Sequence, residues 1–384
     1  MLIVGTETNR AMQPLTKSNT RVLSYILVTV VLVNNAVYQT AFQFHQPLFV
    51  FFLLIFVSPW AIFLAKWPLR TYLVFLAPLV PSLAISVYEV LLNHDTEYLT
   101  RALYFFSVFF VFFSCARILS DSAALFPPPT LIVIGYFFAG VIYFIIGDRD
   151  LLNPNWFSMT CYYLLALSGR DVSCRQLLLL IGAAMFLYES RGATVVFTLV
   201  LILQGSATLR ASVRKAAVPL VLATSVFGCF LASGALSGSL SESEAVQSSS
   251  SEFISRGLGG RELALGPGWS LFLQNPFFGE GFGASTSFNV EDYAGFEKDV
   301  QIHVASLDWG IRAGAFGLIG ITWLIGMKLK RADEQRLPFL FGAVVSMLFY
   351  NTFALSHVGL NLFAYALLLL SLTRPDSISR THNG

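Results

Sequence analysis

Long apolar runs recur along the chain, and most approach the roughly 20 residues that a helix needs to cross the hydrocarbon core of a membrane. Polar residues gather between the runs. Runs of this length, without alternation of polar and apolar positions, predict helices and not the strands of a membrane barrel. We predict an all-α, polytopic membrane bundle of about twelve transmembrane helices, at residues 22–41, 48–65, 71–92, 102–117, 129–147, 155–168, 176–188, 192–205, 216–235, 305–327, 337–354 and 357–373.

One connection between these runs is far longer than the others. Residues 236–304 separate the ninth and tenth runs, whereas most other connections are short. The first part of this loop, 237–252, is rich in Ser and Glu and is typical of a flexible linker. The second part, 253–283, mixes aromatic, apolar and Gly residues, so we expect it to pack on the mouth of the bundle as short helices and turns.

The basic residues orient the predicted helices. Seventeen of the 24 Lys and Arg residues fall in the loops and termini of one side, and seven fall on the other. Loops rich in Lys and Arg stay in the cytoplasm, so both termini are expected there and the 236–304 loop in the periplasm. The expected divisions are 1–235 with nine helices, the loop 236–304, and 305–384 with three helices and a cytoplasmic tail.

The composition excludes an ordinary soluble domain. The chain of 384 residues is 55% hydrophobic and only 12% charged, too little charge to cover the surface of a soluble protein of this size. The large loop is net acidic, which argues against nucleic acid as a partner. The four Cys residues show neither metal-ligand spacing nor a disulfide pattern, so we expect no metal and no cofactor.

Charged residues are predicted at the outer rim of the bundle and not at membrane depth. Ion-coupled transporters usually keep an ionisable group at membrane depth, so this pattern argues against transport. The rim candidates are Glu189, Arg191, Arg256, Arg261, His303, Asp308 and Arg312.

Three rim residues have both a structural and a functional interpretation. Arg191, in a tight turn beside Gly192, is either a membrane-surface anchor or a bidentate ligand for a lipid-borne phosphate. Arg261 has a structural interpretation, a salt bridge to an acidic neighbour such as Glu262, and its functional interpretation comes only from the family resemblance given below. His303 is either structural or a general base, because its reference pKa lies near neutrality.

Three motifs occur in order on the predicted outer face. Ser190-Arg191-Gly192 comes first, followed by an Arg-x-x-x-Leu element at Arg261 and Leu265 that continues to Asn-Pro and Gly-x-Gly. His303 opens the third, with a Leu four residues on and Gly further along. The remaining motif residues are Asn275, Pro276, Gly279, Gly281, Leu307, Gly314 and Gly317.

Over roughly residues 176–330 these motifs resemble the bacterial O-antigen ligase and polymerase superfamily, integral-membrane glycosyltransferases that use undecaprenyl-diphosphate-linked glycans. The chain departs from the family pattern at Gly266-Pro267-Gly268, which is expected to interrupt a helix that is normally continuous.

The resemblance implies transfer of a glycan from undecaprenyl diphosphate to an acceptor hydroxyl at the periplasmic face of the inner membrane. Arg191 and Arg261 would bind the diphosphate without a metal, His303 would orient or deprotonate the acceptor, and the lipid would lie in a groove between helices.

We favour a polymerase of lipid-linked repeat units for an exopolysaccharide, capsule or O-antigen. The partners expected for it are membrane lipid and, in the same pathway, a flippase and a chain-length regulator. A ligase acting on lipid A-core stays open, as does a flippase or polysaccharide export component.

Overall fold

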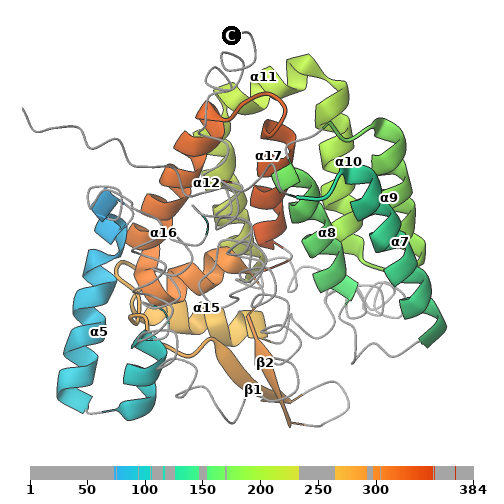
Figure 1. Ribbon diagram of the computed structural model, residues 1–384. Coiled ribbons are helices and arrows are strands. Elements are labelled where there is room, and N and C mark those ends of the chain that lie inside the picture. The colour runs from blue at the N-terminus through green and yellow to red at the C-terminus, as the bar shows by residue number, and fades with distance from the viewer. Residues whose placement is uncertain are drawn as a thin grey trace, which may run out of the picture.

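The structure is a computed structural model, and it is mainly helical, as expected (Figure 1). The residues that it describes are 73–103 without 75 and 94, 105, 116, 126–146, 154–168, 171–232, 264–291, 297–348 without 303, and 350 and 368. The elements are η3 (Ala77–Leu79), α5 (Val80–Asn93), α7 (Pro129–Ile146), α8 (Pro154–Ser168), α9 (Cys174–Phe186), α10 (Arg191–Gly205), α11 (Ala207–Lys215), α12 (Ala217–Ala232), α15 (Leu265–Gln274), β1 (Ser287–Glu291), β2 (Glu297–Gln301), α16 (Ala305–Arg331), α17 (Leu337–Val345) and η6 (Ser346–Leu348).

Most described helices coincide with the apolar runs. Helices α7, α8, α9, α10 and α12 begin and end within three residues of the predicted bounds, whereas α16 extends four residues further. The predicted helices at 22–41 and 48–65 lie outside the described residues, as do almost all of 357–373 and most of 102–117. The pattern of apolar residues therefore predicted the positions of these six helices correctly.

By their length and composition, few of the described helices could cross a membrane as single helices. Helix α16 qualifies, and α10 with α11 would be a second candidate if this pair, bent by 108°, counted as one span. Several other described helices are apolar but shorter, between 10 and 17 residues. Twelve transmembrane helices thus remain a prediction.

The loop between α12 and α16 contains the only strands that the described residues form. Strands β1 and β2 make an antiparallel hairpin in which Ser287 lies opposite Gln301. The hairpin lies beside α15, at the end of the molecule opposite α11 (Figure 1). We expected short helices and turns here, and the turns and α15 are present, but the hairpin was not predicted.

Helix α15 runs through Gly266-Pro267-Gly268 without a break, so the expected interruption is wrong. Pro267 is the third residue of the helix, within the first turn, where an N–H would have no partner inside the helix. Gly268 is buried and faces Ile302 and Leu307. Proline and glycine are therefore accommodated at the start of the helix, and glycine permits the close packing.

Helix α16 packs along α12 and contains the main irregularity of the fold. Gly314 has φ 64° and ψ −175°, a conformation essentially restricted to glycine. In an unbroken helix the carbonyls of Ile311 and Arg312 would accept from the N–H groups of Ala315 and Phe316. The break at Gly314 exposes these four backbone groups to other partners.

The Asn275–Gly283 segment supplies those partners. Its backbone donates two hydrogen bonds to α16 and accepts two from it. The bonds run from Glu280 N–H to Ile311 O (2.7 Å), from Gly281 N–H to Arg312 O (3.1 Å), from Ala315 N–H to Pro276 O (2.8 Å) and from Phe316 N–H to Phe277 O (3.1 Å). The Asn-Pro and Gly-x-Gly motif is therefore built into the hydrogen bonding of α16.

Two glycines allow this insertion. Gly279 has φ 77°, and a Cβ there would lie 2.6 Å from the carbonyl carbon of Arg312. A Cβ on Gly314 would collide with the carbonyl of Phe277. Both motif glycines are thus required by backbone conformation and by close contact.

The glycine turn, at Gly279, Gly281 and Gly283, is covered by two residues that precede the predicted fourth span. The Tyr98 hydroxyl donates to the carbonyl of Glu280 (2.7 Å) and lies against Gly281, while the Tyr98 ring lies against Gly283. Burial raises the pKa of Tyr98, so its hydroxyl stays protonated as a donor. From α5, the Ser86 hydroxyl accepts from the N–H of Phe282 (2.8 Å).

At the opposite end of the molecule, hydrogen bonds connect segments that were predicted to be cytoplasmic. The Arg214 guanidinium of α11 donates to the carbonyl of Ala332 (3.2 Å), beyond α16. Arg210 donates to the carbonyls of Leu203 and Gln204 (3.0 and 2.7 Å), at the C-terminal end of α10. Contacts at each end therefore connect segments that were assigned to the same side of the membrane.

Gly314→Ala should destabilise the protein by about 1–3 kcal/mol, because alanine neither adopts this backbone conformation easily nor fits against Phe277. Thermal unfolding of the purified protein in detergent measures the effect. Gly135→Ala is the matched control, because a Cβ at Gly135 meets nothing within 4 Å and alanine favours the helix. Equal unfolding temperatures of the two variants would contradict the role given to Gly314.

Candidate active site

The Ser190-Arg191-Gly192 turn joins α9 to α10, next to the end of η6. Glu189 has φ 49° and reverses the chain. Ser190 is the N-cap residue of α10, but its side chain makes no capping hydrogen bond. Its hydroxyl donates instead to Asn155 Oδ1 (2.8 Å), at the start of α8. The side chain thus fixes the turn to a neighbouring helix.

Tyr350 completes this polar cluster. Its hydroxyl lies 3.1 Å from Ser190 Oγ and donates to Asn155 Oδ1 (3.3 Å). A Cβ on Gly192 would lie 2.7 Å from the Tyr350 hydroxyl, so glycine lets the first turn of α10 approach the tyrosine. Asn155, Ser190 and Tyr350 together hold the start of α10.

Arg191 is the first residue of α10 and is exposed. The N-terminal end of a helix carries partial positive charge and N–H groups without partners inside the helix. A cation is unfavourable there, whereas an anion is favoured by both the helix and the guanidinium. The position of Arg191 therefore suits an anionic ligand at this turn.

The chain around His303 lies near the same cluster. His303 itself is outside the described residues, but its neighbours Ile302 and Val304 are buried. At Gly228 of α12, the nearest side chains are those of Ser306, Val304 and Leu348. Since Leu348 precedes Tyr350 by two residues, the start of α16 lies close to the Tyr350 cluster.

Arg261 also lies outside the described residues, three positions before the first described residue of its segment. That residue, Ala264, is fully buried and packs in one cluster with Ile302 and Val304. The chain that follows Arg261 is therefore anchored beside the residues that flank His303.

Asp308 and Arg312 are not the rim charges that we expected. Their exposed fractions are 1% and 4%, and the guanidinium donates to Asp308 Oδ1 (3.1 Å). It also donates to the carbonyls of Phe282 and Ala284 (2.9 and 2.6 Å) and to Thr286 Oγ1 (3.0 Å). Arg312 therefore anchors the chain between the glycine turn and β1, and it is committed to the protein.

Asn155 and Tyr350 were not identified from the sequence. Each lies at the predicted outer end of an apolar run, a signal shared by many structural residues. Among the described residues, no group of three His, Cys, Asp or Glu side chains is arranged to hold a metal ion.

Comparison with known families places part of this site, the Ser190-Arg191-Gly192 turn, in a recognised domain. Residues 176–322 match the model of the O-antigen ligase family. No curated protein and no solved structure matches the chain. The matched range runs from α9 into α16 and includes Arg191, Arg261 and His303. Together with the ordered motifs, this match supports the resemblance of residues 176–322 to the O-antigen ligase and polymerase superfamily.

Proposed function

We propose that this protein polymerises undecaprenyl-diphosphate-linked repeat units into a surface polysaccharide at the periplasmic face of the inner membrane. The observation that carries the proposal is Arg191, exposed at the N-terminal end of α10 within the matched family domain. A diphosphate on a membrane lipid is an anion that this arrangement of guanidinium and helix end would favour.

The reaction exchanges one bond at the anomeric carbon of the donor sugar. The acceptor hydroxyl oxygen forms a bond to this carbon, while the bond to the diphosphate oxygen breaks. In the proposed mechanism His303 accepts the hydroxyl proton. Arg191 and Arg261 stabilise the negative charge that develops on the leaving undecaprenyl diphosphate, without a metal ion.

The proposed topology has twelve transmembrane helices, both termini in the cytoplasm and residues 236–304 in the periplasm. The Tyr98–Glu280 and Ser190–Tyr350 contacts support it, because each joins segments assigned to the outer side. The Arg214–Ala332 contact joins segments assigned to the cytoplasm. In this arrangement Arg191, the chain near Arg261 and the start of α16 face the periplasm.

A ligase is the second candidate, because the matched family model is described as O-antigen ligase. The donor and its diphosphate are the same in both reactions. The acceptor differs: a polymerase uses another lipid-linked repeat unit, whereas a ligase uses the sugar of lipid A-core. A lipid-linked-oligosaccharide flippase would use the same lipid but form no glycosidic bond.

Arg191→Ala should lower kcat/KM by about 10²–10³-fold, because one charged donor to the leaving group is lost. Arg261→Ala should have a similar effect, and Arg191→Lys should lie between, since lysine retains charge but not the planar fork. The assay uses purified protein and a defined undecaprenyl-diphosphate repeat unit. Arg175→Ala, an exposed arginine at the start of α9, is the control. Full activity of both alanine variants would rule out the diphosphate assignment.

Deletion of the gene should leave surface glycan as single repeat units, because a polymerase joins units before their final attachment. Gel separation of the cell-surface glycans measures this distribution. Long lipid-linked chains that are not attached to an acceptor would instead identify a ligase.

A further inference from the structure

A basic cluster lies where the last turn of α16 meets the last turn of α11. Arg214 of α11 donates to the carbonyl of Ala332, just beyond α16. Gly326 of α16 lies against Val218, near the start of α12, which follows α11. Figure 1 shows α11 and the C-terminal end of α16 at the same end of the molecule. The basic cluster comprises the cations of the two last turns, Arg214, Lys215, Lys328, Lys330 and Arg331.

The acidic residues that follow α16 do not neutralise this cluster. Asp333 pairs with Arg336 (3.0 Å), and Glu334 lies 3.6 Å from Arg214. In the part of the chain that the structure describes, the other four cations of the cluster form no ion pair. Like charges held close together repel one another. An anion bound among them would therefore be stabilised.

An exposed apolar stripe leads along α16 to the basic cluster. Its members, Phe316, Ile319 and Trp323, are 54%, 55% and 51% exposed. Spacings of three and four residues place them on one face of the helix, and Lys330, seven residues after Trp323, continues that face. Helix α16 is long and apolar enough to cross a membrane. This face thus combines apolar side chains along the span with an exposed cation at its end.

We propose that an anionic phospholipid binds this surface, with its phosphate among the cations of the cluster and its acyl chains along the stripe. A zwitterionic phospholipid fits the stripe equally well, but it has no net charge to attract the cluster. Each Lys or Arg near a membrane surface strengthens the binding of anionic lipid by about fivefold. Charge complementarity therefore selects the occupant.

The glycan donor is not the expected occupant of this surface. Helix α10, about 22 Å long, separates Arg191 at its start from α11 beyond its end. The basic cluster is therefore remote from the proposed diphosphate site. For the same reason this inference does not depend on the proposed function.

Lys330→Gln combined with Arg331→Gln tests the phosphate end of the proposal. Two exposed charges are lost, so the affinity for phosphatidylglycerol should fall by about 25-fold, fivefold for each charge. Native mass spectrometry of the purified protein in detergent measures bound lipid over a titration, with zwitterionic phosphatidylethanolamine as the comparison lipid. Lys215→Gln, on α11, is an independent variant that should lower the affinity by about fivefold.

Two controls separate charge from other effects of substitution. Lys330→Arg combined with Arg331→Lys keeps both charges and should keep the affinity of the wild-type protein. Arg175→Gln removes an exposed charge at the start of α9, outside the cluster, and should leave the affinity unchanged. Equal binding of both lipids by the wild-type protein, or equal losses in the glutamine and charge-conserving double variants, would overturn the proposal.

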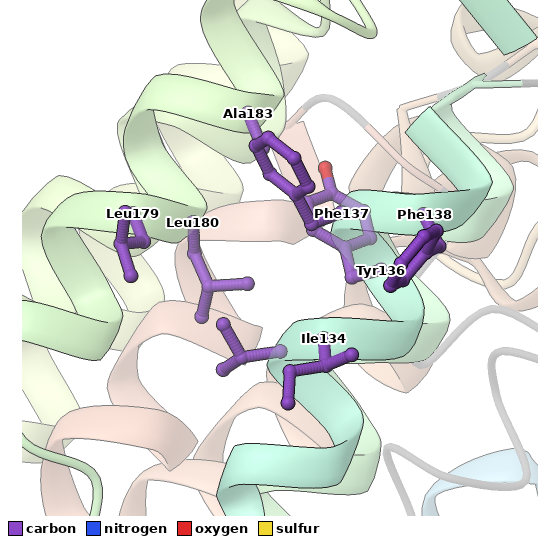
Figure 2. A pocket seen from close by; sticks show the side chains of 8 residues that line it. Ile134, Tyr136, Phe137, Phe138, Leu179, Leu180 and Ala183 are labelled. Atoms are coloured by element: carbon purple, nitrogen blue, oxygen red, sulfur yellow. The ribbon is translucent and has the colours of Figure 1, made fainter. Parts of the chain in front are cut away.

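Photo-crosslinking tests the acyl-chain end of the proposal. A p-benzoylphenylalanine replaces Trp323 in the stripe or, as control, Phe137, which is 48% exposed in an apolar groove between α7 and α9 (Figure 2). The residues that line this groove carry no charge. The probes are phosphatidylglycerol and phosphatidylethanolamine with a labelled acyl chain. Capture in place of Trp323 should favour phosphatidylglycerol, whereas capture in place of Phe137 should not distinguish the two lipids. Equal capture of both lipids in place of Trp323 would contradict the proposed site.

Discussion

The exchange of backbone hydrogen bonds at Gly314 is the constraint on which the end of this protein opposite α11 depends. A helix break in an apolar environment is costly unless its N–H and C=O groups find partners. Here the Asn275–Gly283 segment supplies them, and the same four bonds satisfy four of its own backbone groups. Tyr98 and Ser86 bind this segment from one side, and Arg312 holds the chain that follows it. The positions of α15, the hairpin and the start of α16 follow from this junction.

The helices were predictable because, in a chain with so little charge, a long apolar run has few structural alternatives to a helix. Helix α11 was not predicted because it is short, with nine residues, and polar. It has no buried residue that would produce an apolar pattern in the sequence. The β1–β2 hairpin was missed since 287–301 is polar and pairs only within itself. Arg312 was expected at the rim because sequence reveals charge but not the carbonyls that surround a guanidinium after folding.

The candidate site was predicted in part. Arg191 could be identified because basic residues are scarce on the predicted outer side and because glycine follows it. Asn155 and Tyr350 could not, since their contacts to Ser190 join positions 35 and 160 residues away. Likewise, the motif glycines marked a turn, but no local pattern shows that the turn completes the hydrogen bonding of α16.

The length of α10 has a consequence for the depth of the candidate site in the membrane. Its 15 residues span about 22 Å, less than the roughly 30 Å of a bilayer's hydrocarbon core. In the proposed topology α11, bent by 108° from α10, lies along the cytoplasmic surface. Arg191 would then lie several ångströms below the outer surface, and the membrane must thin locally, or the donor must sink, for the diphosphate to meet the guanidinium. In the proposed topology such a recessed site would admit a lipid-borne diphosphate laterally, whereas soluble nucleotide sugars and free phosphate would have to leave water to compete.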